Sequence, residues 1–458
     1  MNFMRKYVLM FIILGTITEG FGQDKKEILK LSISEAQTFA LQNNRSIRSA
    51  KVDVSSMDKQ VWATIATGLP QFTFDANYQH QFVIPQLSFG PVLDISSLPD
   101  GPVNKSDLQN AYKNSPPISL GVRNNTTFNF TVSQLIFSGE YLVGLQASKV
   151  VKQVTEKALV KIEGQTEETV ATTYYLVLIL DENARVLRES LKSTDQTYSD
   201  LVKMNQEGFN EETDVDQMKI GRSNIMTLIT SIDAQKELSM KLLKYQLGVG
   251  FDQPVMLTDS LPAIIEEGNI KYLSVPEFDV KNSIDFKMIN DQEKVSALQL
   301  KRQQSKLLPT ISGFYRHQEQ SNAPAFNFAV KDIVGVSLNL PIITSGLRMA
   351  NIGMAKYDLV KTRLNKENIE QGLIMEFETA RSGYHTAFSN FTTNKESMLL
   401  SRKVYDKTVI KYKEGVSTSF ELTQNQAQFL TAESNYYNSV LSLLNAKAKL
   451  DRILSISK

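Results

Sequence analysis

The 458-residue sequence contains no cysteine, which excludes disulfide bridges, thiolate metal sites and a lipid anchor on an N-terminal cysteine. Lysine and arginine total 50 against 49 for aspartate and glutamate, a net charge of +1. A nucleic acid or another polyanion recognised through bulk charge is therefore not expected as a partner. His80, His317 and His385 lie far apart, and neither a phosphate-binding loop nor a nucleophile elbow occurs, so we expect no catalytic residues, cofactor or metal.

Long hydrophobic runs are also missing after the first 22 residues. At the start of the chain, Arg5 and Lys6 precede an apolar run over residues 7–17, and Gly20 and Gly22 follow it. This order is typical of a signal peptide and predicts cleavage near residue 22. No later stretch is apolar over the ~20 residues that a spanning helix needs. The mature chain is therefore expected to leave the cytoplasm, and any membrane span would have to consist of strands.

Two parts of the chain resemble each other at one offset. Residues 136–139 recur at 343–346, and the pair Glu207 and Gly208 recurs at 414–415; 346 minus 139 and 415 minus 208 are both 207. We therefore predict two structural repeats, over 23–248 and 282–458, with a linker over 249–281. The first repeat is longer because it holds a proline-rich loop between residues 72 and 128.

Alternating apolar and polar residues predict four strands. Two strands are expected in each repeat, at about 71–84, 123–137, 310–318 and 326–341. Such alternation is typical of transmembrane barrels. The smallest known single-chain barrels need about eight strands, so four strands cannot close alone and several chains would share one barrel.

Two proline-free segments predict very long helices, and a shorter helix returns from each. The expected ranges are about 140–205, 213–247, 347–413 and 421–455. Within residues 170–201, apolar or small side chains recur in steps of three and four, and the same seam recurs 207 residues later. Many seam residues are alanine, serine or threonine, which would let helices pack closely around an open lumen. The predicted fold class is mainly α, with a shared transmembrane β-barrel.

Together these features resemble the TolC-type outer membrane efflux protein family over nearly all of the mature chain. The resemblance rests on segment 31–36 with Asn43 and Asn44, the Leu-Pro elements, the Phe-Ser-Gly turn at 137–139, and the turns that begin at Glu207 and Glu414. It implies a homotrimer with a twelve-stranded barrel in the bacterial outer membrane and a helical tunnel in the periplasm. It also implies a passive channel, not an enzyme, that docks a periplasmic adaptor protein bound to an inner membrane pump.

The resemblance points to specific residues near the second turn. In the family, a tyrosine three residues before the turn glycine, an arginine two after it and acids six and nine after it surround the closed entrance. Tyr412 and Glu421 match this pattern, whereas Ser417 and Gln424 depart from it. With their first-repeat counterparts, the expected pore constriction comprises Glu421, Gln424, Asp214, Gln217 and Tyr412.

Both turns would form the adaptor-docking tips, with the residues Glu207, Gly208, Phe209, Glu414, Gly415 and Val416. We expect Gly208 and Gly415 to end the long helices in the left-handed conformation. Three copies of Glu421 around a narrow lumen would form a like-charge ring suited to a gate. Alternatively, Asp214 and Glu421 lie in the first turns of their helices because the helix dipole favours carboxylates there. Thr213 and Thr418 could then cap these helices.

Two rival functions remain at this point. The helices alone fit a secreted trimeric coiled-coil stalk or adhesin, and lipid insertion of the four strands would distinguish the channel from it. An exported enzyme on a helical scaffold is the other rival, but the sequence lacks a paired catalytic constellation. We therefore expect the outer membrane channel subunit of a tripartite efflux or type I secretion system, whose cargo the sequence does not specify.

Overall fold

The computed structural model describes residues 27–87, 101–102, 104–107, 110, 117–267, 278–323, 327 and 329–455. The expected signal peptide lies outside the described residues. The chain divides into two compact units. Of the described residues, the hairpin unit contains those within 27–45, 166–267 and 384–448, and the sheet unit contains those within 46–165, 278–383 and 449–455. None of the described helices has an apolar stretch of the length and hydropathy that a membrane crossing requires.

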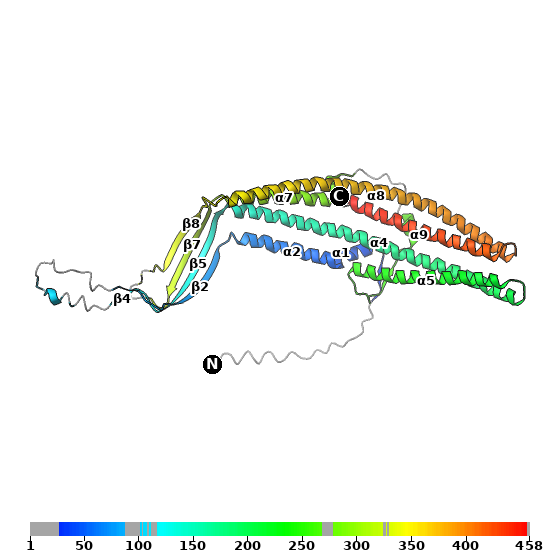
Figure 1. Ribbon diagram of the computed structural model, residues 1–458, viewed down its shortest axis with the longest axis horizontal. Helices are drawn as coiled ribbons and strands as arrows, with labels where there is room; N and C mark the ends of the chain where they lie inside the picture. The colour runs from blue at the N-terminus through cyan, green and yellow to red at the C-terminus, as the bar shows by residue number, and fades with distance from the viewer. Residues whose placement is uncertain are drawn as a thin grey trace, which may run out of the picture. The chain divides into compact units, whose positions relative to one another are not determined.

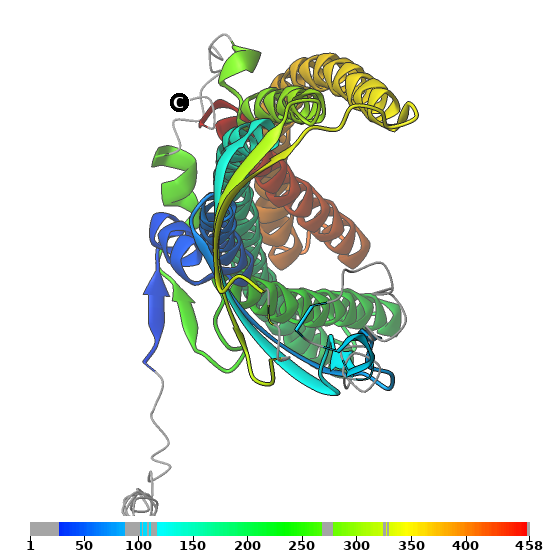
Figure 2. The ribbon, with the colours of Figure 1, turned by 90° about the vertical axis from the view of Figure 1, so that its left-hand side faces the viewer.

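The sheet unit contains a four-stranded antiparallel sheet (Figure 1). Its strands are, in spatial order, β2 (Gln71–His80), β5 (Asn124–Ser138), β7 (Thr310–Gln320) and β8 (Asp332–Asn339). β5 and β7 come from different halves of the chain and pair directly, with Val132 opposite Tyr315. The ladder contains an irregularity between Leu135 and Phe137, of the kind that bends a strand. Figure 2 shows the resulting curvature of the sheet.

The strand ends differ from the predicted ranges where pairing stops. β2 ends at His80 because its partner β5 begins at Asn124, which lies opposite. β8 ends at Asn339, shortly before Pro341, which has no N–H to donate to a ladder. At its other end, β8 begins at Asp332. The residue before it, Lys331, still accepts a hydrogen bond on its carbonyl from the backbone N–H of Gln318 in β7, at 2.7 Å. The long loop of the first repeat adds a short antiparallel pair, β3 (Gln86–Leu87) and β4 (Ile118–Ser119).

In one isolated copy of the chain, the sheet exposes apolar side chains. Phe72 on β2 is 78% exposed, and Val334 and Val336 on β8 are 80% and 70% exposed. β2 and β8 are also the two edges of the sheet, since each pairs on one side only. Open edges and contiguous apolar faces of this kind are typical of surfaces that lipid or other chains cover.

Several helices accompany the sheet in this unit. They include α2 (Arg45–Ala66), α7 (Ile284–Ser305) and the first parts of α4 (Gly139–Gln206) and α8 (Leu347–Lys413). Three ion pairs connect α4 with α7: Lys157 with Asp291, Lys161 with Asp285 and Glu140 with Arg302. The Asp291 side chain is 2% exposed and also accepts a hydrogen bond from Lys294 at 2.8 Å. These contacts fix α7 along α4.

Two antiparallel helical hairpins make up most of the hairpin unit (Figure 1). The end of α4 returns as α5 (Glu212–Leu247), and the end of α8 returns as α9 (Ser419–Ser455). Most of the heptad seam predicted on α4 is buried, at Val170, Thr173, Val177, Leu180, Ala184, Leu187, Thr194 and Leu201. Its other two predicted members, Leu191 and Tyr198, are only partly buried. The in-phase seam on α8 is likewise buried at Tyr384, Ala387, Phe391 and Thr408. The long helices are therefore held by side-by-side packing.

The first helix of the described chain begins with a capping box and packs against α4. Ser32 precedes α1 (Ile33–Asn43), its hydroxyl accepts from the backbone N–H of Glu35, and the Glu35 carboxylate accepts from the backbone N–H of Ser32 at 2.8 Å. This reciprocal bonding explains the Ser-Ile-Ser-Glu opening of the sequence. α1 then buries Ala36 and Ala40 against Tyr174 of α4.

The predicted linker contains regular structure. β6 (Val255–Leu257) pairs in parallel with β1 (Leu29–Leu31), and α6 (Leu261–Glu267) follows. The fully buried Tyr174 donates a hydrogen bond to Asp259 at 2.9 Å, which ties α4 to this segment. A short 3-10 helix, η2 (Val280–Asn282), precedes α7. Residues 268–277 lie outside the described part of the chain.

Candidate functional site

The two turns at the ends of the hairpins have the same backbone geometry. Gly208 and Gly415 have φ angles of +78° and +71°, so the left-handed conformation predicted for both is confirmed. Phe209 donates to the carbonyl of Met204 at 2.9 Å, and Val416 donates to that of Lys411 at 2.8 Å. These bonds span six residues, as in the Schellman motif, and occupy helix-end carbonyls that would otherwise lack partners. Glycine is used because a side chain is strained at these φ angles.

The first turns of the returning helices are capped differently. Thr418 caps α9, since its hydroxyl accepts from the backbone N–H of Glu421 at 3.2 Å. The corresponding prediction for Thr213 is wrong: α5 begins after Glu211, without a side-chain cap, and Thr213 lies inside the helix. Its hydroxyl donates instead to the carboxylate of Glu211 at 3.1 Å. Asp214 and Glu421 both lie in first turns, as the helix-dipole interpretation expects.

Replacing Thr418 with alanine should loosen the first turn of α9. Loss of an N-cap side chain costs about 1 kcal/mol, and 1.4 kcal/mol corresponds to a factor of ten, so amide hydrogen exchange at Glu421 should rise by roughly fivefold. Thr213→Ala is the matched control, because that hydroxyl caps nothing in α5. Equal changes in the two variants would contradict the assignment of Thr418 as the cap.

A serine absent from the predicted site connects the two hairpins. Ser419, the first residue of α9, is 4% exposed, and its hydroxyl donates to the carboxylate of Asp214 on α5. The amide oxygen of Gln217 lies 3.3 Å from the same hydroxyl. Burial and then the charge of Asp214 raise the pKa of Tyr412 to about 12. Ser419 thus contacts two predicted constriction residues, Asp214 and Gln217, and a third, Tyr412, lies near Asp214.

The other two predicted constriction residues lie on exposed positions of α9. The carboxylate of Glu421 accepts from the hydroxyl of Ser417 at 2.6 Å, within its own turn. Gln424 lies one helical turn further along α9 and is exposed. Ser417, which stands where the family carries arginine, therefore supports Glu421 within one hairpin and does not bridge to the other.

The predicted docking tips are exposed. Phe209 and Val416 are 73% and 75% exposed, and both follow a turn glycine. Glu207 and Glu414, which precede the glycines, are exposed as well. Each tip therefore presents an apolar side chain beside a carboxylate. Phe420, at 60% exposure, adds an apolar residue that the sequence analysis did not include.

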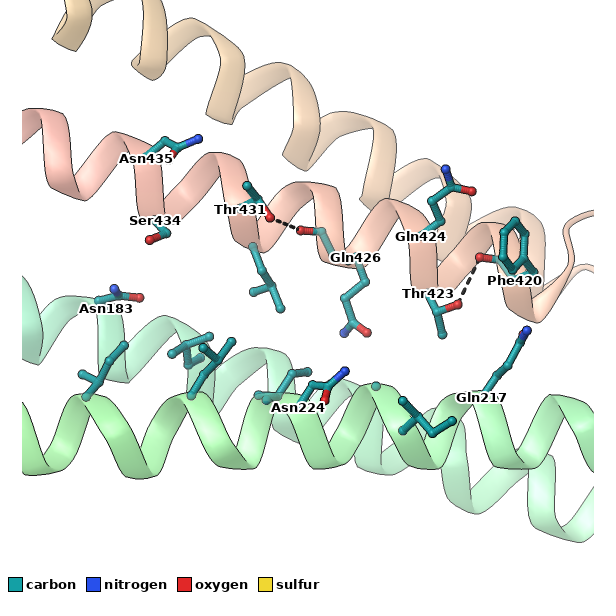
Figure 3. Close-up of a pocket in the computed structure, with 18 residues that line it drawn as sticks. Asn183, Gln217, Asn224, Phe420, Thr423, Gln424, Gln426, Thr431, Ser434 and Asn435 are labelled. Carbon is teal, nitrogen blue, oxygen red and sulfur yellow. Dashed lines mark hydrogen bonds between the residues drawn. The ribbon is translucent and has the colours of Figure 1, made fainter.

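A groove between α5 and α9 was not predicted from the sequence. Its volume is about 670 Å³, and it is lined by Asn183, Leu187, Gln217, Ile220, Gly221, Asn224, Ile225, Leu228, Ile232, Phe420, Thr423, Gln424, Gln426, Ala427, Leu430, Thr431, Ser434 and Asn435. None of these lining residues is charged. Figure 3 shows Thr423 and Gln426 pointing from α9 toward α5, and Gln217 and Asn224 pointing from α5 toward α9. Apolar side chains therefore share this groove with uncharged polar groups.

Gln426 also anchors a buried polar network beside the groove. Gln426 is 4% exposed. Its side-chain amide donates to the Thr194 hydroxyl at 2.7 Å and to the Tyr405 hydroxyl at 3.3 Å. The network links α4, α8 and α9. A polar residue at a heptad seam position was the sequence signal that could have identified it.

The second half of the chain matches a known protein family. Residues 281–455 match the family model described as outer membrane efflux protein. The Toxin and drug export protein A of Aggregatibacter actinomycetemcomitans is 22% identical over 287 residues, which are 61% of this chain and 60% of that protein. The match thus spans less than two thirds of the relative's length.

Solved outer membrane proteins have the same fold. The Campylobacter jejuni CmeC outer membrane channel has a TM-score of 0.72 at 16% identity, over 93% of this chain and 86% of its own. VceC of Vibrio cholerae has a TM-score of 0.69 at 14% identity, over 92% and 95%. The Neisseria gonorrhoeae MtrE channel, solved in its open state, has a TM-score of 0.67 at 14% identity, over 92% and 88%. Residues 281–455 of the chain therefore match the outer membrane efflux protein family, and the chain as a whole has the fold of solved outer membrane channels.

Proposed function

We propose that the chain is the exit duct of a tripartite efflux or type I secretion system. Three copies would close one twelve-stranded barrel in the outer membrane, and their helices would form a tunnel into the periplasm. A periplasmic adaptor would dock at the tips and connect the duct to an energised inner membrane pump. The duct itself would be passive, so the choice of cargo would lie with the pump.

The four-stranded sheet with two open edges carries this proposal. β2 and β8 each leave one side of their backbone unpaired, and lipid supplies no hydrogen bonds for such groups. Pairing β2 of one copy with β8 of the next would satisfy both edges. Because four strands are too few to close alone, a ring of copies is the arrangement that leaves no edge. The exposed phenylalanine and valine side chains would then face lipid.

A membrane and conductance experiment tests the proposal. The full-length protein should fractionate with outer membranes, require detergent, run as a trimer and conduct ions in a planar bilayer. Val336→Lys should block insertion, since a lysine at the lipid face of a barrel costs about 2–4 kcal/mol near the midplane. Ser337→Lys is the matched control, because Ser337 is the next residue on β8 and its side chain points to the face opposite to that of Val336.

The rival coiled-coil stalk predicts a different result. A secreted structural protein would be recovered as a water-soluble oligomer without conductance, and Val336→Lys would not change its location. A soluble monomer would contradict both interpretations. These outcomes distinguish lipid insertion from helical assembly alone.

For the gate, we propose that the contact of Ser419 with Asp214 holds the two hairpins of one chain together at the entrance. Tyr412 and Gln217 would line the same closed junction, and three copies of Glu421 with Gln424 would surround the lumen. The support is the buried position of Ser419, the proximity of Tyr412 to Asp214, and the exposure of Glu421. The adaptor would bind the exposed tips, where Phe209 and Val416 offer apolar contacts.

A further inference from the structure

Glu433 lies on the buried face of α9, among apolar residues. It is 5% exposed, and Phe429, Tyr437 and Val440 on the same face are 5%, 6% and 1% exposed. A carboxylate pays a large desolvation cost in such surroundings unless it is paired or holds its proton. The packing of the Glu433 side chain therefore depends on whether its carboxyl group holds a proton.

The charges around Glu433 do not neutralise it. On α4, Arg185 donates to Glu189 at 2.6 Å and to Glu182 at 3.0 Å, so it is already held by two carboxylates of its own helix. On α8, the exposed Arg402 acts on Glu433 from the edge of the seam.

The charged groups of α5 in this region pair with α4. Asp233 accepts from Arg188, and Lys236 donates to Asp181. On α9 itself, the neighbouring titratable groups are Tyr436 and Tyr437. Burial and then the charge of Glu433 raise the pKa of Tyr437.

Burial raises the pKa of Glu433 to about 7, and the positive charges of Arg402 and Arg185 offset only part of this effect. The pKa in the unfolded chain is about 4.3. Because the folded value is the higher one, the stability of the packed seam falls as pH rises from about 4 to about 7, and it changes little above that range.

We propose that Glu433 is a proton-responsive joint: with its proton it packs inside the seam of α4, α8 and α9, and without it the seam loosens around this residue. This property goes beyond the proposed export function and does not depend on it. The packing of the helices around Glu433 would be more stable at acidic pH and less stable at neutral and alkaline pH. Its location in the hairpin unit means that the effect would be local to residues near 433.

Amide hydrogen exchange of the full-length protein tests this inference. After correction for the intrinsic pH dependence of exchange, protection of residues 426–440 should fall by at least about tenfold between about pH 5 and about pH 8. Glu433→Gln should remove this dependence and be better protected at the higher pH. Glu396→Gln, at an exposed position on α8, is the matched control and should behave as the unaltered protein. Unchanged pH dependence in Glu433→Gln would overturn the proposal.

A second measurement covers the case in which Glu433→Gln fails to fold. Infrared difference spectroscopy of the unaltered protein detects the C=O stretch of a protonated carboxyl group. A band that disappears as pH rises through about 7 is expected from a buried acid of this kind. If carboxyl groups titrate only below about pH 5, where exposed acids do, Glu433 is ionised in the folded protein and the joint does not exist.

Discussion

Replacing Ser419 with alanine is expected to raise the resting conductance of the reconstituted channel about tenfold or more. The Ser419 hydroxyl donates to the Asp214 carboxylate and is the polar bridge between the first turns of α9 and α5. A hydrogen bond to a charged group contributes about 1.5–3 kcal/mol, and 1.4 kcal/mol shifts an equilibrium tenfold. If opening separates the two hairpins, this contribution is lost from the closed state only.

Ser417→Ala is the matched control for this prediction. Ser417 lies two residues earlier, and its hydroxyl donates to Glu421 within its own turn. Its removal should therefore leave the junction of the hairpins intact and change resting conductance far less. Single-channel recording in a planar bilayer measures both variants. Equal conductance of Ser419→Ala and the unaltered protein would show that the contact with Asp214 does not hold the entrance closed.

Replacing Asp291 with asparagine should destabilise the sheet unit by about 2 kcal/mol, because a hydrogen bond to a charged group contributes about 1.5–3 kcal/mol and the ionised carboxylate is lost. The Asp291 side chain is 2% exposed and accepts from both Lys157 and Lys294. Burial by itself raises the pKa of Asp291, but the hydrogen bonds of the two lysines outweigh it and keep the pKa below its ordinary value. The stabilisation is therefore present above about pH 4 and is lost as pH falls through the folded pKa.

Asp285→Asn is the control, because the Asp285 pair with Lys161 also joins α7 to α4 but has side-chain exposures of 25% and 36%. Such an exposed pair contributes about 0–1 kcal/mol. Thermal unfolding of the detergent-purified protein at neutral pH should therefore show a large loss for Asp291→Asn and a small one for Asp285→Asn. The difference between Asp291→Asn and the unaltered protein should shrink below about pH 4. A constant difference down to pH 3 would contradict the role of the ionised carboxylate.

Periodicity made the long elements readable from the sequence. The helix expected over about 140–205 spans Gly139–Gln206, and the one expected over 347–413 spans Leu347–Lys413. These ranges follow from the absence of proline inside and from a glycine in the left-handed conformation just beyond each C-terminal end, at Gly208 and Gly415. Strand ends were less accurate, because a strand ends where its neighbour does, as at His80 opposite Asn124.

Local signals also decided part of the candidate site. The positions of Gly208, Gly415, Thr418 and Glu421 depend on their nearest neighbours in the chain, so the sequence predicts them directly. Thr213 shows the limit of this reasoning. Both threonines are suitable capping residues. However, α5 begins at Glu212, so Glu211 occupies the N-cap position and Thr213 lies inside the helix.

By itself, the sequence determined the repeated order of strands and long helices, the seam residues, the two left-handed glycines and the resemblance to outer membrane efflux proteins. Only the tertiary structure decided that Ser419 meets Asp214, 205 residues earlier in the chain. It also decided that Glu433 is buried and lies within reach of the charges of Arg185 on α4 and Arg402 on α8. The reason is physical: periodicity and helix signals act within a few residues, whereas a side chain's contacts and the pKa of its acid depend on which distant helices pack around it.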